Sequence, residues 1–309
     1  MYSLKCLSQR ELASYEALCF PYFRLMLKAS APGCGLLAVG ASLLGEPIGL
    51  LLAQQDPGTS HSAVIHSVVV ASRHRRIGVA TALLARAERE LESRAAQSAQ
   101  ITFMNDRPFT RALEGLLAKR QWHRSQLTAL FCEADFGTLS QAPWVQRRWD
   151  FLPEFEIVQW GDVTPQDRAE ALQRQRHSRW FPEALNPFTE EHLTDPRLSL
   201  GLRHRGQLVG WCIVRELANR ILRVVSLFVN RELQGSGRSV ALLAEAIKRS
   251  GRSEMDRILF DVCSEREQMV KFVHRRMAPH LKSIRSASTS RKSLNINQQL
   301  EGSVHAALQ

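Results

Sequence analysis

Two short stretches of the sequence combine glycine with basic or amide side chains at a spacing that suits the binding of an anion. Residues 75–80 read RRIGVA, and residues 234–239 read QGSGRS. Each stretch follows a β-branched apolar run and precedes leucines and alanines at helical spacing. The start of a helix has unpaired N–H groups and a partial positive charge, and glycine lets a phosphate come close to the backbone. Both stretches therefore predict a phosphate cradle between a strand and a helix.

Each predicted cradle has a glycine at its last turn and a small residue two positions later, which also leaves room for a phosphate. A side chain at the entrance, Arg75 or Gln234, can donate further hydrogen bonds, and neighbouring arginines add positive charge. The candidate residues are Arg75, Arg76, Gly78, Val79, Ala80 and Thr81 in the first cradle, and Gln234, Gly235, Ser236, Gly237, Arg238 and Ser239 in the second.

Other phosphate-binding patterns fit these loops less well. A P-loop needs Gly-Lys followed by Ser or Thr, which neither loop contains. A dinucleotide-binding fingerprint has its first glycine directly after the strand, whereas five residues separate Val229 from Gly235. The first loop also has only a single glycine. A plain structural turn without a ligand is the remaining alternative.

The two loops belong to an internal repeat. The segment SVVVASRHRRIGVATALLARAE (67–88) aligns with SLFVNRELQGSGRSVALLAEAI (226–247) at an offset of 159 residues. Upstream, GEPIGLLLAQ (45–54) aligns with GQLVGWCIVR (206–215) at an offset of 161 residues. Two matching elements in the same order predict two copies of one fold, with a loop between the elements that differs in length.

Each copy is expected to form an α/β domain in which helices flank a mixed, mostly antiparallel twisted sheet. The fourth strands are SAVIHSVVV and ILRVVSLFVN, whose β-branched residues suit a strand that is covered on both faces. The first copy would close with the strand QLTALFCEAD, and part of the tail after Ser283 would complete the second sheet and then become mobile. The predicted domains are residues 1–136 and 155–309, joined by a linker at 137–154.

The composition narrows the classes of protein and of partner. The formal net charge of +11 favours an anionic partner, and 44% of the residues are hydrophobic, which is ample for buried cores. The basic residues are spread out and no nucleic-acid-binding pattern accompanies them, so nucleic acid is not the expected partner. No apolar run reaches the roughly 20 residues of a membrane helix, and the N-terminus does not read as a secretory signal. Six scattered cysteines without a CxxC pair indicate free thiols, a cytoplasmic location and no metal.

The pattern Arg/Gln-x-x-Gly-x-Ala/Gly at a strand–helix junction resembles that of the GNAT superfamily of N-acetyltransferases. The resemblance covers nearly all of both copies, and the layout is similar to that of mycothiol synthase-like duplicated members, in which one copy can be degenerate. It implies that each loop binds the pyrophosphate of acetyl-CoA or of another acyl-CoA. It also implies that the backbone of the fourth strand pairs with the pantetheine arm, at Val68 and Val70 or at Leu227 and Val229. Ser239 replaces the usual small residue and would either crowd the diphosphate or hydrogen-bond to it.

The implied reaction is the attack of a neutral amine on a thioester, with a base to accept the amine proton and a donor for the oxyanion. The usual family base is a glutamate on the fourth strand, but neither AVIHSVVV nor LRVVSLFV contains a carboxylate. His66 is therefore the candidate base, with a structural histidine as the alternative. The usual family acid is a tyrosine on the helix after the fifth strand. It is excluded at that place, because the chain has only Tyr2, Tyr15 and Tyr22.

The expected function is acyl-CoA-dependent N-acyl transfer, with acetyl-CoA as the first candidate donor, to an amine of a small molecule or peptide. The missing carboxylate and tyrosine leave a second interpretation open, a catalytically degenerate protein that binds acyl-CoA or a partner in a regulatory role. A basic protein associated with nucleic acid is a third. The expected partners are an acyl-CoA and an amine-bearing acceptor, with no membrane. Because the chain carries the fold twice, a monomer is compatible with the sequence.

Overall fold

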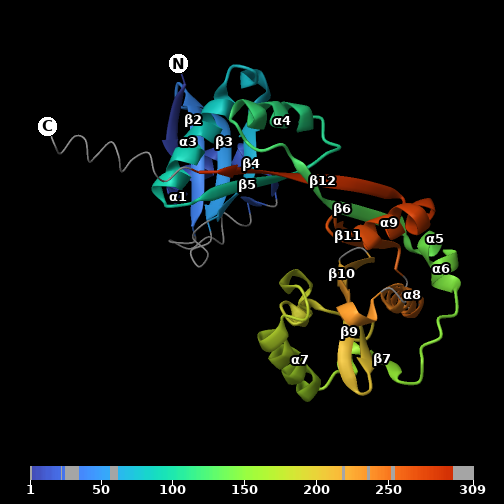
Figure 1. Cartoon of the computed structure of the whole chain (residues 1–309). Helices are drawn as coiled ribbons and strands as arrows, with labels where there is room; N and C mark the ends of the chain where they lie inside the picture. Colours follow the sequence, from blue (N-terminus) through green and yellow to red (C-terminus); the bar gives the residue numbers. More distant parts are fainter. Residues whose placement is uncertain are drawn as a thin grey trace. The chain divides into compact units, whose positions relative to one another are not determined.

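The computed structural model describes residues 2–21, 23–24, 35–55, 62–217, 220–234, 237–251 and 255–294. The chain divides into two compact units. The first unit comprises Met1–Thr128 together with Ala287–Gln309, and the second unit comprises Ala129–Ser286. Each unit has a mixed sheet with helices packed on it, so the predicted fold class is confirmed (Figure 1).

The strands of the first unit, in chain order, are β1 (Ser3–Cys6), β2 (Leu36–Leu43), β3 (Glu46–Gln55), β4 (Ser62–Val70), β5 (Ser98–Met104) and β12 (Ser283–Ser293). They form a sheet with the same spatial order, β1-β2-β3-β4-β5-β12. Neighbouring strands are antiparallel except for β4 and β5, which are parallel. A parallel pair needs a crossover connection, and a helix between the two strands provides it.

Helices cover both faces of this sheet. They are α1 (Gln9–Leu12), α3 (Val79–Ser93) and α4 (Thr110–Lys119), with short 3-10 helices at Ala13–Leu18 and Ser72–His74. The helices α3 and α4 share an apolar core with Leu51 and Ile65. The segment around α1 packs on the opposite face, against Leu50 and Leu52. Successive residues of β3 thus fill two different cores, as the alternation of side chains along a strand requires.

The strands of the second unit are β6 (Gln126–Asp135), β7 (Phe155–Gln159), β8 (Leu200–His204), β9 (Gln207–Leu217), β10 (Ile221–Val229) and β11 (Arg257–Cys263). Their spatial order is β6-β11-β10-β9-β8-β7. Only β10 and β11 are parallel. This parallel pair corresponds to β4 and β5 of the first unit, as the sequence repeat predicts.

The helices of the second unit also lie on two sides of its sheet. They are α5 (Phe136–Ser140), α6 (Pro143–Gln146), α7 (Pro165–Ser178), α8 (Arg238–Ser250) and α9 (Glu267–Phe272), with 3-10 helices at Trp160–Asp162, Glu183–Leu185, Glu191–Leu193, Arg231–Leu233 and Ala278–His280 and a π-helix at Val273–Met277. The main core joins the sheet to α5, α6 and α8. A separate core that is rich in aromatic residues lies on the side of α7. Trp144 and Val145 of the predicted linker are buried in the main core, so this part of the linker is an integral part of the second unit.

The last strand of each sheet comes from the other copy. The strand β6 was expected to close the first copy, but it pairs antiparallel with β11 from Ala129↔Cys263 to Asp135↔Arg257. The strand β12 pairs antiparallel with β5, from Ala287↔Met104 to Ser293↔Ser98. The compact units therefore differ from the domains that the repeat predicts, 1–136 and 155–309, by an exchange of closing strands. The predicted mobile end of the tail lies outside the described residues.

A buried carboxylate fixes β12 in the first unit. Glu88 of α3 is 3% exposed and accepts hydrogen bonds from Trp122 Nε1 and Lys292 Nζ, both at 2.8 Å. Arg120 donates to the same carboxylate. Lys292 also donates to the backbone carbonyl of Arg120 at 2.8 Å. Buried charges are stable only when they are paired. This cluster therefore ties β12 to α3, through Glu88, and to the end of α4, through Arg120.

Candidate functional site

The parallel strands of each unit separate toward their carboxyl ends. The ladder between β4 and β5 runs only from Ser62↔Ser98 to Ile65↔Ile101, although both strands continue further. The ladder between β10 and β11 likewise ends at Arg223↔Leu259. Beyond these positions, no described residue of one strand is paired with a residue of the other strand. Unpaired backbone groups of β4 and β10 are therefore available to a ligand at this edge of each sheet.

A β-bulge lies at each point of separation. In the pairing of β3 with β4, Leu52 is opposite Ser67 and Ala53 is opposite Ile65, so His66 is the extra residue. In the pairing of β9 with β10, the corresponding shift makes Val225 the extra residue. The two positions are equivalent in the repeat. Bulges are frequent next to active sites because they redirect side chains and free backbone groups.

The first predicted cradle is an open helix start. Gly78 is the N-cap of α3 with φ 88°, a conformation that favours glycine, and Arg76 also has a positive φ of 65°. Among the described residues, a Cβ atom at Gly78 would have one neighbour within 4 Å, the hydroxyl of Tyr2 at 3.9 Å. Arg75 Nε donates to the carbonyl of Val70 at 3.0 Å, which joins the loop to the end of β4. The N–H groups at the start of α3 thus face space that an anion can enter.

The second predicted cradle has the same frame but is covered. Gly237 is the N-cap of α8 with φ 77°, and Gln234 Nε2 donates to the carbonyl of Val229 at 2.7 Å, as Arg75 does to Val70. A side chain at Gly237, however, would lie 3.0 Å from the ring of Trp149. Gly235 and Ser236 lie outside the described residues.

The cover is the end of the predicted linker. Trp149 Nε1 donates to the carbonyl of Trp144 at 3.0 Å, which fixes the indole ring over the start of α8. The guanidinium of Arg238 lies 4.3 Å from the centre of the Phe155 ring. Residues 149–152 leave a space of only about 70 Å³ beside Gly237. Such a space holds a few water molecules and not a diphosphate.

His66 lies at the bulge on the side of the sheet that α1 covers. Its Nε2 is 3.3 Å from Oε1 of Gln54, and its ring centre is 5.3 Å from that of Phe23. Partial burial lowers the pKa of the imidazole below its ordinary value. The ring is therefore neutral at pH 7. With the amide oxygen of Gln54 as the acceptor, the proton of this hydrogen bond is on Nε2, and Nδ1 makes no hydrogen bond to a described residue.

The serine that follows each bulge distinguishes the two units. Ser226 Oγ donates to the carbonyl of Leu185 at 2.8 Å and accepts from Trp211 Nε1 at 2.9 Å. Ser67, its equivalent, is 4% exposed and has no hydrogen-bond partner among the described residues. A buried hydroxyl without a partner costs free energy, so such groups concentrate at functional sites. Ser67 could not be recognised from the sequence, because a serine in a strand carries no distinct pattern.

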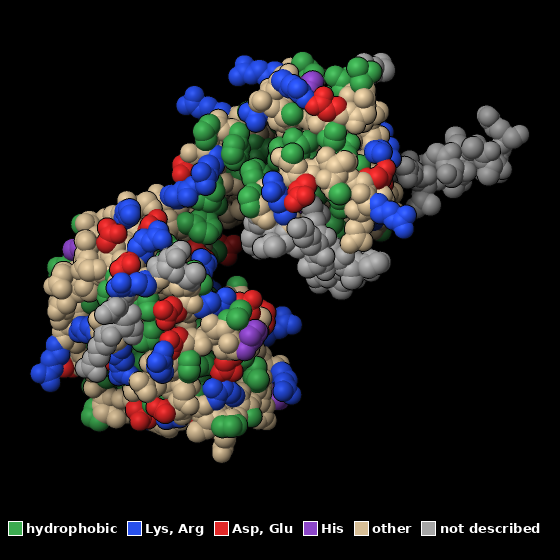
Figure 2. Space-filling model, turned by 180° about the vertical axis from the view of Figure 1, so that it is seen from behind, with side chains coloured by type: hydrophobic (Ala, Val, Ile, Leu, Met, Phe, Trp, Pro, Cys, Tyr) green, Lys and Arg blue, Asp and Glu red, His purple; other side chains and the backbone are tan. Residues whose placement is uncertain are grey.

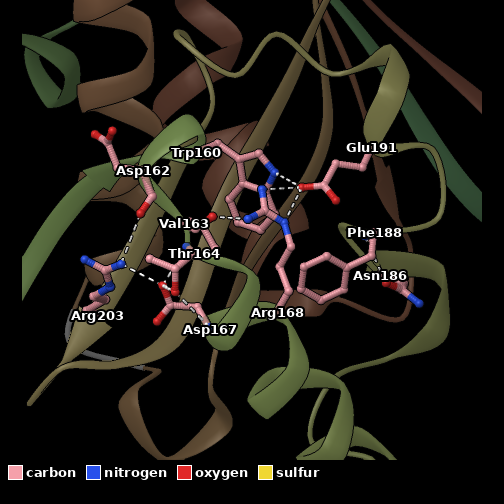
Figure 3. A network of polar contacts seen from close by, with 10 residues as sticks. All are labelled: Trp160, Asp162, Val163, Thr164, Asp167, Arg168, Asn186, Phe188, Glu191 and Arg203. Atoms are coloured by element: carbon pink, nitrogen blue, oxygen red, sulfur yellow. Dashed lines mark hydrogen bonds and ion pairs between the residues drawn. The ribbon is translucent and has the colours of Figure 1, made fainter.

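In the second unit, aromatic side chains and ion pairs fill the region next to Ser226. Four aromatic rings form a cluster in which the ring centres are 4.8–6.2 Å apart: Trp180, Phe181, Trp211 and Phe228. Figure 3 shows a network of polar contacts around Trp160, which belongs to the same core as these rings. The residues of this network include Trp160, Thr164, Asp167, Arg168, Glu191 and Arg203.

Glu191 and Asp167 are the anionic centres of this network. Glu191 Oε1 accepts from Trp160 Nε1 at 2.7 Å and from Arg168 at 2.9 Å. Burial would raise the pKa of Asp167, but hydrogen bonds from Arg203 and Thr164 outweigh it and hold the pKa below its ordinary value. Both carboxylates are paired with arginines, and they fix α7 over the aromatic cluster. The second unit has a packed core where the first has an unpartnered serine.

Charged side chains and free thiols are distributed over both units. Figure 2 shows Lys and Arg side chains interspersed with Asp and Glu on the visible face of each part. Burial raises the pKa of the free thiols of Cys132 and Cys212 to about 12. Within the described ranges, no group of His, Cys, Asp and Glu side chains could hold a metal ion. No described helix is both long and apolar enough to cross a membrane.

The comparisons with known proteins give a family and a fold. A model of the acetyltransferase (GNAT) family matches residues 3–113 and again residues 165–277. A tandem GNAT protein from the clavulanic acid biosynthesis pathway has a similar structure, with a TM-score of 0.62 and 16% identity over 96% of this chain and 99% of that chain. A GCN5-related N-acetyltransferase from Sphaerobacter thermophilus is similar at a TM-score of 0.64 and 18% identity, over 95% of this chain and 96% of that chain. No curated protein matches the chain.

A third solved structure, a GCN5-related glucosamine N-acetyltransferase region of a fungal multi-domain β-N-acetylglucosaminidase, is similar at a TM-score of 0.69 and 15% identity. The aligned region covers 94% of this chain and 38% of the fungal chain. At these identities the solved structures bear on the fold alone. The family model matches most of the chain, in two regions that coincide with the repeat. The chain therefore belongs to the acetyltransferase (GNAT) family, and it carries the family's fold twice.

Proposed function

We propose that the protein is an acyl-CoA-dependent N-acyltransferase whose first unit binds the acyl-CoA, with acetyl-CoA as the preferred donor. The observation that carries the proposal is the open helix start at Gly78, directly beside strands that separate at a bulge. Proteins of this fold use an acyl-CoA as co-substrate. The cytoplasmic location expected from the sequence remains a prediction.

Different residues of the first unit would bind the pyrophosphate and the pantetheine arm of the acyl-CoA. The loop residues Arg75, Arg76, Gly78, Val79, Ala80 and Thr81 would bind the pyrophosphate, because a helix start offers unpaired N–H groups and partial positive charge and the two arginines add further charge. The backbone of Val68 and Val70 would pair with the pantetheine arm.

The chemistry would take place at the bulge. The amine attacks the thioester carbonyl, and the tetrahedral intermediate then expels the thiolate, which takes up a proton. A backbone N–H freed by the bulge would donate to the oxyanion. His66, neutral at pH 7 with Nδ1 free, would accept the amine proton directly or through water.

The second unit is proposed to keep the fold without binding the donor in this state. Its predicted residues Leu227, Val229, Gln234, Gly237, Arg238 and Ser239 form the frame of a cradle, but Trp149 covers the helix start. Ser226 is already satisfied by Leu185 and Trp211. One acyl-CoA per chain is therefore expected.

A matched pair of substitutions tests the assignment by calorimetric titration with acetyl-CoA. Ala80→Asp puts a carboxylate at the proposed pyrophosphate site and should abolish binding, because it repels the diphosphate. Ser239→Asp, at the equivalent position of the second unit, should leave affinity and a stoichiometry of one unchanged. An acidic residue in the first turn of a helix does not destabilise it, so both variants should fold. Unchanged binding by Ala80→Asp would refute the assignment.

A catalytically degenerate acyl-CoA-binding protein is the second candidate. The specific observation that favours it is the fourth strand, which has His66 and no carboxylate at the bulge. The two candidates differ in turnover. Release of free thiol from acetyl-CoA that depends on an added amine supports the enzyme. Saturable binding without such release across a panel of small amines and peptides supports the degenerate protein.

A further inference from the structure

A cavity lies in the first unit, on the β12 side of the strand β5. It has a volume of about 740 Å³, and it is lined by the segment after β5, the start of α4, the loop after α4 and Ser288 of β12. The sheet order β4-β5-β12 puts a strand between this cavity and β4. Its lining residues include none of the Gly78 loop. The cavity is therefore separate from the proposed acyl-CoA cradle.

Three arginines from different segments line this cavity. Arg107 precedes α4, Arg111 is in its first turn, and Arg124 follows its end. None of the three forms an ion pair with a described residue. The acidic Glu114, also in the lining, accepts a hydrogen bond from Ser125 at 3.1 Å. The lining thus contains three arginines that form no ion pair with a described residue and two acidic residues, Asp106 and Glu114, so its charged side chains leave a net positive charge.

Ser288 is a buried polar residue that faces the same cavity. It is 7% exposed, and its hydroxyl makes no hydrogen bond to any described residue. Its side chain lies on the same face of β12 as that of Ser290, whose Oγ donates to His123 O, in the loop after α4, at 2.6 Å. Thr289 points to the opposite face, where its Oγ1 lies 2.7 Å from Thr102 Oγ1. The unpartnered Ser288 hydroxyl would be satisfied by a ligand atom in the cavity.

We propose that this cavity binds a small phosphorylated molecule through its phosphate group. Guanidinium groups bind phosphate oxygens in pairs, and donors from several directions suit a tetrahedral dianion better than a planar carboxylate. The start of α4, a helix of 10 residues, adds partial positive charge beside Arg111. Ser288 donates to a further oxygen. The volume lies within the range of about 300–1,000 Å³ that is typical of small-molecule sites.

Calorimetric titration with inorganic phosphate tests the site on the full chain. The Ala80→Asp background excludes phosphate from the Gly78 loop, so the test does not depend on the proposed acyltransferase function. Saturable binding at millimolar phosphate is expected. Arg111→Gln and Arg124→Gln should each weaken it about tenfold or more, since a hydrogen bond to a charged group is lost. Ser288→Ala should weaken it by a smaller factor.

Lys119→Gln is the matched control, because it removes one positive charge from the same helix outside the cavity. It should leave the affinity for phosphate unchanged. Non-saturable binding, or equal weakening by Lys119→Gln, would overturn the proposal. Titration of Arg124→Gln without the Ala80→Asp change, with coenzyme A and with 3′-dephospho-coenzyme A, tests whether the phosphate in the cavity is the 3′-phosphate of the acyl donor. If Arg124→Gln weakens only coenzyme A, the cavity holds the 3′-phosphate of the acyl donor, and a separate ligand is excluded.

Discussion

The buried carboxylate of Glu88 should account for a large part of the stability of the first unit. Glu88→Gln preserves the shape of the side chain and its contact with Trp122, but it removes the negative charge. Arg120 and Lys292 then lose their anionic partner. The substitution therefore tests the charge alone and not the packing of α3.

The expected magnitude follows from the exposure of the three side chains. Breaking a buried ion pair costs about 3–5 kcal/mol when the remaining charge is inaccessible to water. Glu88 is 3% exposed, whereas the Arg120 and Lys292 side chains are 31% and 18% exposed, so water relieves part of that cost. We expect a loss of about 2–3 kcal/mol. For a unit of this size, that loss lowers the Tm by roughly 4–12 °C.

Differential scanning calorimetry measures the Tm, and hydrogen exchange of the β5 and β12 amides assigns the change to the first unit. Glu245→Gln is the control, because Glu245 pairs with Arg249 on the surface of α8 with both side chains about a third exposed. That pair should contribute no more than about 0.5 kcal/mol. Lys292→Met should also cost less in the Glu88→Gln background than in the native chain, since the two residues are coupled. Equal effects of Glu88→Gln and Glu245→Gln would refute the reasoning.

Three further predictions concern the exchanged strand, the covered loop and the candidate base. Thr102→Cys combined with Thr289→Cys should form a disulfide that joins β5 to β12, seen by mass spectrometry of unreduced peptides; free thiols at both positions in the folded chain would contradict the pairing. Trp149→Ala should uncover the second helix start and raise the calorimetric stoichiometry of acetyl-CoA from one to two, whereas an unchanged stoichiometry would show that Trp149 is not the obstacle. If His66 is the base, the ratio of native kcat/KM to that of His66→Gln should be constant above about pH 6.5 and fall below it, because burial lowers the pKa of His66 and only the neutral ring accepts a proton. A ratio of one at every pH would remove His66 from the mechanism.

Local signals in the sequence predicted the elements that position the candidate site. The glycine of each loop, Gly78 and Gly237, caps its helix with a positive φ, and the β-branched runs before them form the strands β4 and β10. Thr164 caps α7 through a capping box with Asp167, as the TPQD sequence predicts. These features depend on residues that are close in the chain, so their patterns are legible in a single sequence.

The features that were missed depend on contacts between distant residues. The strand β6 is largely apolar and β12 is rich in serine and basic residues, but nothing in either sequence specifies which edge the strand will join. The bulge at His66 is a shift of register relative to β3, which the sequence of β4 alone does not encode. The position of Trp149 over Gly237 likewise results from tertiary packing of residues that the sequence marked only as a linker.

The exchange of closing strands also constrains the order in which the chain can fold. During synthesis, residues 98–104 of β5 leave the ribosome long before residues 287–293, which are their partners. The edge of β5 therefore stays unpaired until nearly the whole chain has been made, and unpaired edges are prone to association with other chains. The second unit, by contrast, has all its strands as soon as β11 emerges. The unit that contains the first residues of the chain is thus the last to be completed.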